Sequence, residues 1–298
     1  MKGPKFTGIM PAFVTPFLSD NKTINESATR RLIDLQIEQG AAGFYVLGGT
    51  GEGLVMAPNE RKIMCEVSID AVDGRVPVIN HVASMNLNDA IDLAKHAERA
   101  GADAIASVPP SFFAYSENDI YNYYKTLANS VNIPLIIYYH PAAQKDMSAR
   151  LIARIFEIDN VTGVKWSSNN FYELMKLRDM THGEMNVING PDELLVSGLA
   201  AGADAGIGST YNVMLPAFVK LYDSFRAGDI DTARAIQYKI NRVIDKMFRY
   251  GVISAVKHMV TMMGIDVGTA TFPMNQMDAD DVAAFENDLK DAGWPFNV

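Results

Sequence analysis

Cysteine is almost absent from this chain of 298 residues, and basic side chains are fewer than acidic ones. Because Cys65 has no second cysteine to pair with, an internal disulfide is excluded, and the helical pattern at Asn59–Val72 predicts a buried thiol. The formal net charge of −9 argues against a nucleic-acid-binding protein, which would carry a clustered basic face.

Long apolar runs are also missing. No segment approaches about 18 uninterrupted apolar residues, the length that a membrane-spanning helix needs, so no membrane contact is expected. The first residues lead directly into an expected strand and lack the features of a secretory signal, so we expect a cytoplasmic protein. No spacing of His, Cys, Asp and Glu fits a metal site, and the glycines match neither the dinucleotide fingerprint nor the Walker lysine loop. The sequence therefore predicts neither a metal nor a cofactor.

Apolar runs of strand length alternate with helix-period segments over most of the chain. Continuous apolar strands that are each separated by a helix favour a parallel sheet covered on both faces. The expected strands are Ile9–Val14, Gly43–Leu47, Val76–Val82, Ala104–Val108, Pro134–Tyr139, Val161–Trp166, Met185–Ile188 and Ala205–Gly208. Helices are expected between them, for example at Glu26–Gln39, Leu87–Arg99, Glu117–Asn129 and Ala149–Glu157.

One joint between helix and strand recurs along the chain, in Gly40-Ala-Ala-Gly43, Gly101-Ala-Asp-Ala104 and Gly202-Ala-Asp-Ala205. Glycine ends a helix because it adopts positive φ without strain. The repetition predicts a (β/α)₈ barrel, which takes about 250 residues; a doubly wound open sheet is the alternative. We expect a barrel domain over residues 1–226 and a helical extension, packed on the barrel, over residues 227–298. The last expected helices are Pro216–Arg226, Ile230–Tyr250, Val252–Met263 and Ala279–Ala292.

Lys165 carries the most chemical information in the sequence. It lies in the short apolar run Val161–Trp166, which has the composition of a buried strand. A buried ammonium group is costly unless its charge is partnered or its pKa falls. A lysine with a lowered pKa is a nucleophile that forms a Schiff base with a carbonyl substrate. Two interpretations are open: a reactive amine in a dry pocket, or a lysine at the solvent-exposed end of a strand.

A glycine-rich turn, Leu47–Gly53, follows the second expected strand. Glycines let the backbone approach a ligand closely and point successive N–H groups at an anion; a purely structural turn is the alternative. Tyr138 ends the fifth strand, where its hydroxyl can relay a proton, unless the ring only packs under a loop. His140 precedes Pro141, so we expect an extended turn there rather than a base.

Polar side chains also follow the seventh and eighth strands. Asp192 and Glu193 either accept hydrogen bonds from a polyhydroxylated substrate or cap the next helix, whose N-terminal dipole favours carboxylates. Ser209 likewise either binds hydroxyl groups or caps the helix expected to begin near Val213. His81, at the end of the third strand, is expected to be a core histidine whose hydrogen bonds are satisfied.

Four motifs together resemble the N-acetylneuraminate lyase and dihydrodipicolinate synthase superfamily: Gly48-Gly-Thr-Gly-Glu52, Tyr138, Gly163-Val-Lys165 and Gly208-Ser-Thr-Tyr-Asn212. The likeness covers essentially the whole chain, and the motifs stand in the order and spacing of the family. It implies a Schiff-base aldolase of pyruvate on a (β/α)₈ barrel with a C-terminal helical domain. It also implies a homotetramer.

For the site, the resemblance implies that Lys165 forms the Schiff base and that Tyr138 moves protons when the carbon–carbon bond breaks. The imine would serve as an electron sink for the carbanion. Thr50 and the neighbouring backbone amides would hold the pyruvate carboxylate. The other substrate-binding positions that it implies are Gly49, Ser167, Gly190, Asp192, Glu193 and Ser209.

The details favour the sialic-acid lyase branch. No arginine follows Tyr138 where the synthase branch keeps one for a second carboxylate, and Ser167 retains the hydroxyl of the lyases' threonine. Three positions depart from the lyase pattern. Gly49 replaces a serine or threonine, Phe112 replaces a tyrosine that family tetramers lend across an interface, and the stretch after Pro141 lacks the lyases' Leu-Ser/Thr-Gly sequence.

We therefore expect reversible cleavage of N-acetylneuraminate to N-acetylmannosamine and pyruvate. The partners would be small molecules, a 2-keto acid and a sugar-derived aldehyde. Two alternatives stay open. One is a lyase or dehydratase that acts on another sugar-derived 2-keto acid with the same lysine. The other, motivated by Gly49 and Phe112, is a non-catalytic binding protein on this fold.

Overall fold

The computed structural model describes residues 5–143 and 147–296, so residues 144–146 of the stretch after Pro141 lie outside the described part. Its eight strands are β1 Gly8–Pro11, β2 Phe44–Val46, β3 Val78–His81, β4 Ala104–Ser107, β5 Leu135–Tyr139, β6 Val161–Trp166, β7 Asn186–Asn189 and β8 Ala205–Gly208. They are parallel and are hydrogen-bonded in the order β1-β8-β7-β6-β5-β4-β3-β2. A parallel bridge between Ala12 and Tyr45 joins the two end strands and closes the ring. The (β/α)₈ prediction is confirmed, and the open sheet is excluded.

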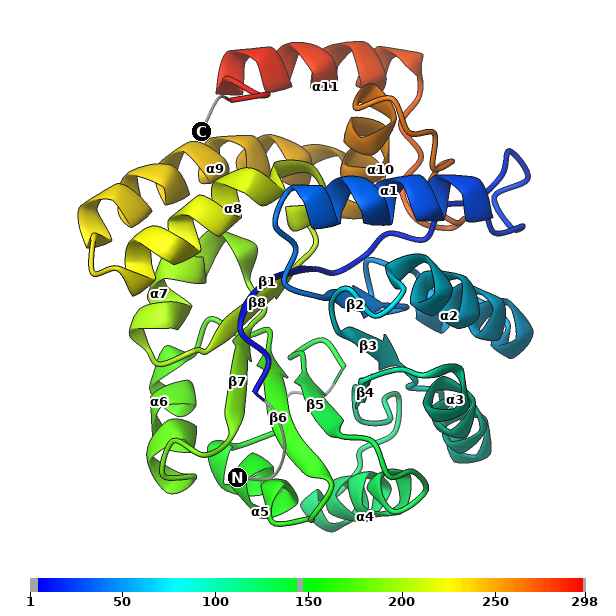
Figure 1. The fold of residues 1–298 in the computed structure, drawn as a ribbon, viewed down its shortest axis with the longest axis vertical. Helices are drawn as coiled ribbons and strands as arrows, with labels where there is room; N and C mark the ends of the chain where they lie inside the picture. The colour runs from blue at the N-terminus through cyan, green and yellow to red at the C-terminus, as the bar shows by residue number, and fades with distance from the viewer. Residues whose placement is uncertain (1–4, 144–146, 297–298) are drawn as a thin grey trace.

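Along the described part of the chain, helices follow the strands and surround them, as Figure 1 shows. They are α1 Glu26–Glu38, α2 Pro58–Val72, α3 Leu87–Ala100, α4 Glu117–Ala128, α5 Ala149–Phe156, α6 Phe171–Met180, α7 Leu195–Ala200 and α8 Tyr211–Arg226. The joint glycine Gly101 ends α3 with φ of 97°, and its N–H bonds back to the carbonyls of Ala97 and Glu98. A left-handed glycine thus turns the chain from helix to strand, as the repeated motif predicts.

The expected boundaries overlap the observed ones, and Val161–Trp166 and Ala205–Gly208 have the expected ends. The eighth helix differs. It begins at Tyr211, before the expected Val213 and Pro216, and Met214 inside it has non-helical angles (φ −136°, ψ 26°). Because Pro216 lacks an N–H and its ring crowds the preceding turn, the first turn of α8 is separated from the rest by a kink.

The strands are buried on both faces, which explains their continuous apolar composition. Met10, Tyr45, Ile79 and Ile136 belong to a cluster inside the barrel, together with alanines of β4 and β8. A larger cluster lies between the strands and the helices. Cys65 of α2 belongs to this outer core, where burial raises the pKa of its thiol to about 12.

The extension consists of α9 Ile230–Tyr250, α10 Val252–Met262 and α11 Ala279–Ala292. In Figure 1 these helices lie on one side of the barrel, beyond α8 and α1. Helix α9 packs along α8, and α11 packs on α9. Asp288 of α11 accepts hydrogen bonds from Lys246 and Arg249 of α9. The C-terminal helices that the fold prediction includes are thus present, and α9 lies along α8 of the barrel.

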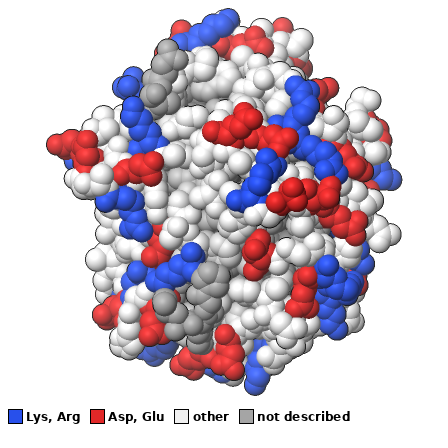
Figure 2. Space-filling view, in the orientation of Figure 1, with Lys and Arg blue, Asp and Glu red and all other residues white. Residues whose placement is uncertain are grey.

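The surface carries charges of both signs. On the face drawn in Figure 2, acidic and basic side chains alternate over the helices rather than gathering into separate fields. Within residues 5–143 and 147–296, every helix is too short or too polar to cross a membrane.

Candidate active site

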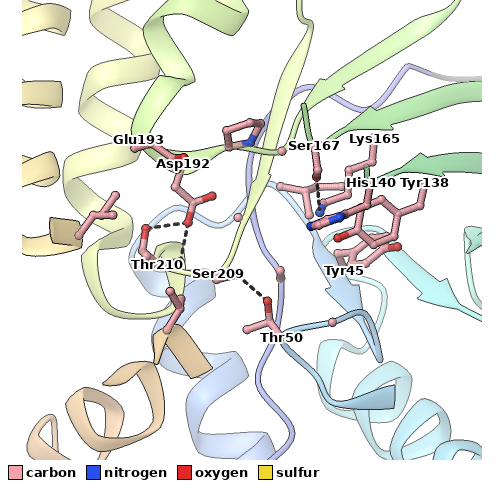
Figure 3. Close-up of a pocket in the computed structure, with 18 of the residues that line it drawn as sticks. Tyr45, Thr50, Tyr138, His140, Lys165, Ser167, Asp192, Glu193, Ser209 and Thr210 are labelled. Atoms are coloured by element: carbon pink, nitrogen blue, oxygen red, sulfur yellow. Dashed lines mark hydrogen bonds between the residues drawn. The ribbon is translucent and has the colours of Figure 1, made fainter. Parts of the chain in front are cut away.

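A cavity of about 290 Å³ opens at the C-terminal ends of the strands, the end of a (β/α)₈ barrel where active sites form. Its walls come from the ends of β2, β5, β6, β7 and β8 and from helices α9 and α10 (Figure 3). Every residue that the sequence assigned to the site lines this cavity. These residues are Gly49, Thr50, Tyr138, Lys165, Ser167, Gly190, Asp192, Glu193 and Ser209.

Lys165 lies on β6 with only 5% of its surface exposed. Its Nζ is 4.0 Å from the centroid of the Tyr138 ring and 5.4 Å from that of Tyr45, and it donates a hydrogen bond to Ser167 Oγ at 3.3 Å. No carboxylate of the described residues lies within ion-pair distance of this amine. The environment of the amine is therefore two aromatic faces and a hydroxyl, and the solvent-exposed strand end is excluded.

Tyr138 is the register partner of Lys165 on the neighbouring strand, so both side chains enter the cavity together. Its ring packs edge-on against Tyr45 and His81, each with centroids 5.9 Å away. Tyr45 was not among the residues predicted from the sequence, and its buried hydroxyl has no hydrogen-bond partner among the described residues. Its place one residue before the end of a strand was the only signal that could have found it.

His81 is the core histidine that the sequence predicts. Its Nδ1 lies 3.1 Å from the Leu47 carbonyl oxygen, and the Val108 N–H donates to its Nε2 at 3.4 Å. Burial, with a smaller contribution from the nearby Arg61 charge, lowers the pKa of His81 to about 3. The ring is neutral at physiological pH, and it braces Leu47 at the start of the glycine-rich turn.

The turn after β2 owes its glycines to packing. Leu47 and Glu52 both have positive φ, 63° and 58°. A Cβ at Gly48 would overlap the ring of Tyr45, and one at Gly53 would overlap the Leu47 carbonyl oxygen. Gly49 differs, since a Cβ there meets no atom within 4 Å. Packing therefore requires glycine at positions 48 and 53. It does not require glycine at position 49, which lines the cavity and has open space around its Cβ position.

Thr50 and Ser209 meet across the cavity floor. Their hydroxyl oxygens are 2.6 Å apart, joining the turn after β2 to the end of β8 (Figure 3). Thr210, the residue before α8, makes no side-chain cap to that helix. The Ser209 hydroxyl instead pairs with Thr50, and no hydrogen bond from it to an N–H of α8 is seen among the described residues.

Asp192 is buried beside the start of α8, where Thr210 donates to its Oδ2 from both N and Oγ1, each at 2.7 Å. Burial raises the pKa of Asp192 to about 6, although the bonds from Thr210 act in the opposite direction. A Cβ at Gly208 would overlap the carboxylate, so glycine is needed there. The short helical turn Asp192–Leu194 has no side-chain cap, so Asp192 does not cap its own helix.

Other positions shape the same wall. Glu193 is half-buried and lines the cavity, and its carbonyl accepts a hydrogen bond from Asn241 of α9 at 3.0 Å. A Cβ at Gly190 would overlap Ser167 Oγ, so this glycine makes room for the serine hydroxyl. His140 also lines the cavity, where burial lowers its pKa, and its Nδ1 accepts the N–H of Ala142.

The helical extension supplies an apolar side of the cavity, and its residues there were not predicted from the sequence. Ile244 and Phe248 of α9 and Val252 of α10 line it, and Phe248 is 54% exposed. These residues lie far along the chain from the barrel motifs, and no pattern in the sequence connects them. Among the described residues, no group of three His, Cys, Asp or Glu side chains is placed to hold a metal ion.

A closed parallel barrel with a cavity and a buried lysine at the C-terminal ends of its strands has the architecture that barrel enzymes use for their active sites. A family model described as the dihydrodipicolinate synthetase family matches residues 5–292. The N-acetylneuraminate lyase of Rhizobium meliloti (strain 1021) is 33% identical over 280 residues, 94% of this chain and 93% of the relative.

Solved structures give the same result. Proteus mirabilis N-acetylneuraminate lyase has a TM-score of 0.92 at 29% identity and covers 98% of this chain and 100% of its own. A prophage protein of the dihydrodipicolinic acid synthase family from Escherichia coli K12, solved in complex with pyruvate, has a TM-score of 0.91 at 28% identity, covering 97% and 99%. The chain belongs to the dihydrodipicolinate synthetase family. Its class is that of the lyases, and among these the aldolases.

Proposed function

We propose that this protein is a pyruvate-dependent lyase that reversibly cleaves N-acetylneuraminate to N-acetylmannosamine and pyruvate through a Schiff base on Lys165. One observation carries the proposal: Lys165 is buried at the cavity floor with its amine over the Tyr138 ring. The relatives named N-acetylneuraminate lyase support the substrate.

The chemistry follows from these two side chains. The neutral Lys165 amine attacks the 2-keto carbon, a carbon–nitrogen bond forms, and the keto oxygen leaves as water. The Tyr138 hydroxyl gives its proton to the departing keto oxygen, a proton that water can also supply, and this leaves an iminium and a phenolate. The phenolate then removes the proton of the hydroxyl group on the carbon beyond the bond to be broken. As that bond breaks, its electrons move into the iminium to give an enamine, and the aldehyde leaves. Protonation of the enamine and hydrolysis release pyruvate and restore the amine.

Polar groups of the cavity would bind the carboxylate and the hydroxyl groups of the substrate. The N–H groups of the turn at Gly49 and Thr50, with the hydroxyl of Ser209 beside them, would bind the carboxylate. Asp192, which is hydrogen-bonded to Thr210 beside Ser209, and Glu193 would accept hydrogen bonds from the hydroxyl groups of the tail. Ser167 and Gly190 line the cavity beside the amine, where the carbon chain would pass.

Reduction with borohydride in the presence of pyruvate tests the proposal directly. The protein should lose activity and gain the mass of a reduced pyruvate adduct on Lys165, located by peptide mass spectrometry. The Lys165→Arg variant keeps a cation of similar length and should gain no adduct, since guanidinium is not a nucleophile. A wild-type protein without an adduct, or an active Lys165→Arg variant, would refute the Schiff base.

A second candidate acts on another sugar-derived 2-keto acid through the same lysine. The open space at Gly49 favours it, because no atom within 4 Å of a Cβ at this position takes the place of the hydroxyl in the lyase pattern. Turnover measured across a series of 2-keto acids separates the two candidates. Tight binding of these acids without turnover or adduct would instead support a non-catalytic binding protein.

We also propose a homotetramer, as the family resemblance implies. Phe112 is 88% exposed and has a strained φ of 80°, and its ring packs on Phe113, which in turn packs on Tyr115. Such an aromatic cluster is suited to burial against a second subunit. Sedimentation at several concentrations would decide the assembly. The division into residues 1–226 and 227–298 and the cytoplasmic location stay predictions from the sequence.

A further inference from the structure

A fully buried ion pair joins the glycine-rich turn to the helical extension. The Glu52 carboxylate lies 2.5 Å from the Nζ of Lys257 on α10, and their side chains are 0% and 1% exposed. Glu52 also accepts the N–H of Thr271 at 2.6 Å, and Lys257 donates to the Thr269 carbonyl at 2.9 Å. Glu52 of the turn and Lys257 of a helix about 200 positions later along the chain therefore share one buried contact.

The position of this pair within the turn is informative. Glu52 stands two residues after Thr50, in a left-handed conformation that a non-glycine residue keeps only when its surroundings hold it. Its backbone N–H bonds to the Gly49 carbonyl at 3.0 Å, which closes the loop that carries both cavity positions. A change at the Glu52 carboxylate would therefore be transmitted over a single turn of backbone to Gly49 and Thr50.

The pair is costly by itself. Burial lowers the pKa of Lys257, and the Glu52 charge acts in the opposite direction. A buried ion pair adds little stability compared with apolar residues of the same volume, whereas losing one partner leaves an uncompensated charge. A pair of this kind contributes little to the free energy of folding. Because it is attached to the turn of Gly49 and Thr50, its role would be to fix the shape of that turn.

We propose that Glu52 and Lys257 are positioning residues, which use the helical extension to hold the turn of Gly49 and Thr50 in the shape that binds the substrate carboxylate. The inference rests on the proposed function for the identity of that carboxylate. It assigns the extension a part in the active site, beyond covering one side of the barrel. Neither residue touches the substrate.

Three variants separate positioning from a purely structural tie. Glu52→Gln and Lys257→Met each leave one partner unpaired, and both are close in shape to the original residues. The double variant removes both charges, so its thermal midpoint should return toward the wild-type value. Lys246→Met is the matched control, because Lys246 pairs with Asp288 within the extension and lies away from the cavity.

Two measurements are made on each protein. Hydrogen–deuterium exchange reports the mobility of residues 48–53, and borohydride trapping at a series of pyruvate concentrations reports half-saturation. We expect faster exchange in the turn and a half-saturation raised about tenfold to a hundredfold in both single variants. In the double variant both effects should persist although the thermal midpoint recovers. The control should match the wild type in both measurements.

The inference is overturned if the double variant is as stable as the wild type and has wild-type exchange in the turn and wild-type half-saturation. In that case the pair only fastens the extension. If the single variants fail to fold, the double variant still decides. If even the wild type forms no pyruvate adduct, the proposed function fails, and the exchange of residues 48–53 alone judges the pair: faster exchange in the stable double variant supports it, and unchanged exchange refutes it.

Discussion

Asp192→Asn should remove the loss of unfolding free energy that the wild-type protein shows as the pH rises. Burial raises the pKa of Asp192 from its ordinary value of 3.8 to about 6. The folded protein therefore binds this proton more tightly than the unfolded chain does. The corresponding stability is fully present below about pH 4 and is lost as the pH rises through about 6.

The size of the effect follows from the two pKa values. A separation of about 2 between them corresponds to about 3 kcal/mol of unfolding free energy at full ionisation. Between pH 4 and pH 8 the wild type should lose roughly 2–3 kcal/mol relative to the variant. The asparagine oxygen can still accept both bonds from Thr210, because both go to a single carboxylate oxygen. The fold around the side chain should therefore survive.

Urea unfolding of both proteins at pH 4, 6 and 8 makes the measurement. Near pH 4 both side chains at position 192 are largely neutral in the folded state, so the two proteins should unfold at similar urea concentrations. At pH 8 the variant should be the more stable one. Under the proposed function, its turnover of N-acetylneuraminate should nevertheless fall, since the carboxylate that would accept from a substrate hydroxyl is gone. Parallel stability curves for the two proteins across this range would refute the raised pKa.

Three further substitutions test the site. Tyr138→Phe should lower turnover by about 10²–10⁴-fold while the pyruvate adduct on Lys165 still forms; full turnover would exclude this hydroxyl as the proton carrier. Gly49→Ser should fold normally and bind pyruvate about 10-fold to 150-fold more tightly than Gly49→Ala, since a hydrogen bond to a charged group contributes about 1.5–3 kcal/mol; equal half-saturation would mean that no carboxylate lies there. Gly53→Ala should destabilise the protein by about 2–4 kcal/mol, because its Cβ would overlap the Leu47 carbonyl oxygen; an unchanged unfolding midpoint would contradict this.

The fold could be predicted because the barrel repeats one local rule. Strands buried on both faces have to be apolar along their whole length, so runs such as Val161–Trp166 stand out without any knowledge of their partners. Glycine at Gly101 marks a helix end by its own backbone preference. The start of α8 was harder to predict. Pro216 is typical of the beginning of a helix, whereas the observed helix has one further turn before it, set off by a kink at Met214.

The cavity residues on the barrel could be predicted from the sequence for a related reason. Parallel strands end at one edge, so polar residues that follow apolar runs, such as Lys165 and Asp192, converge whatever their distance in sequence. Tyr45 was missed because an aromatic residue within an apolar run looks like any core side chain. Phe248 was missed because an amphipathic helix does not reveal which neighbour its apolar face meets.

The sequence alone therefore determined the eightfold alternation of strand and helix, the end of the barrel where the polar residues gather, and the lysine among them. These depend on local periodicity and on the shared direction of parallel strands. Only the tertiary structure decided which side chains surround the Lys165 amine, that Asp192 is buried on Thr210, and that Glu52 meets Lys257. Those contacts join segments far apart in the chain, and their burial, which sets the cost of each charge, exists only once the segments have packed together.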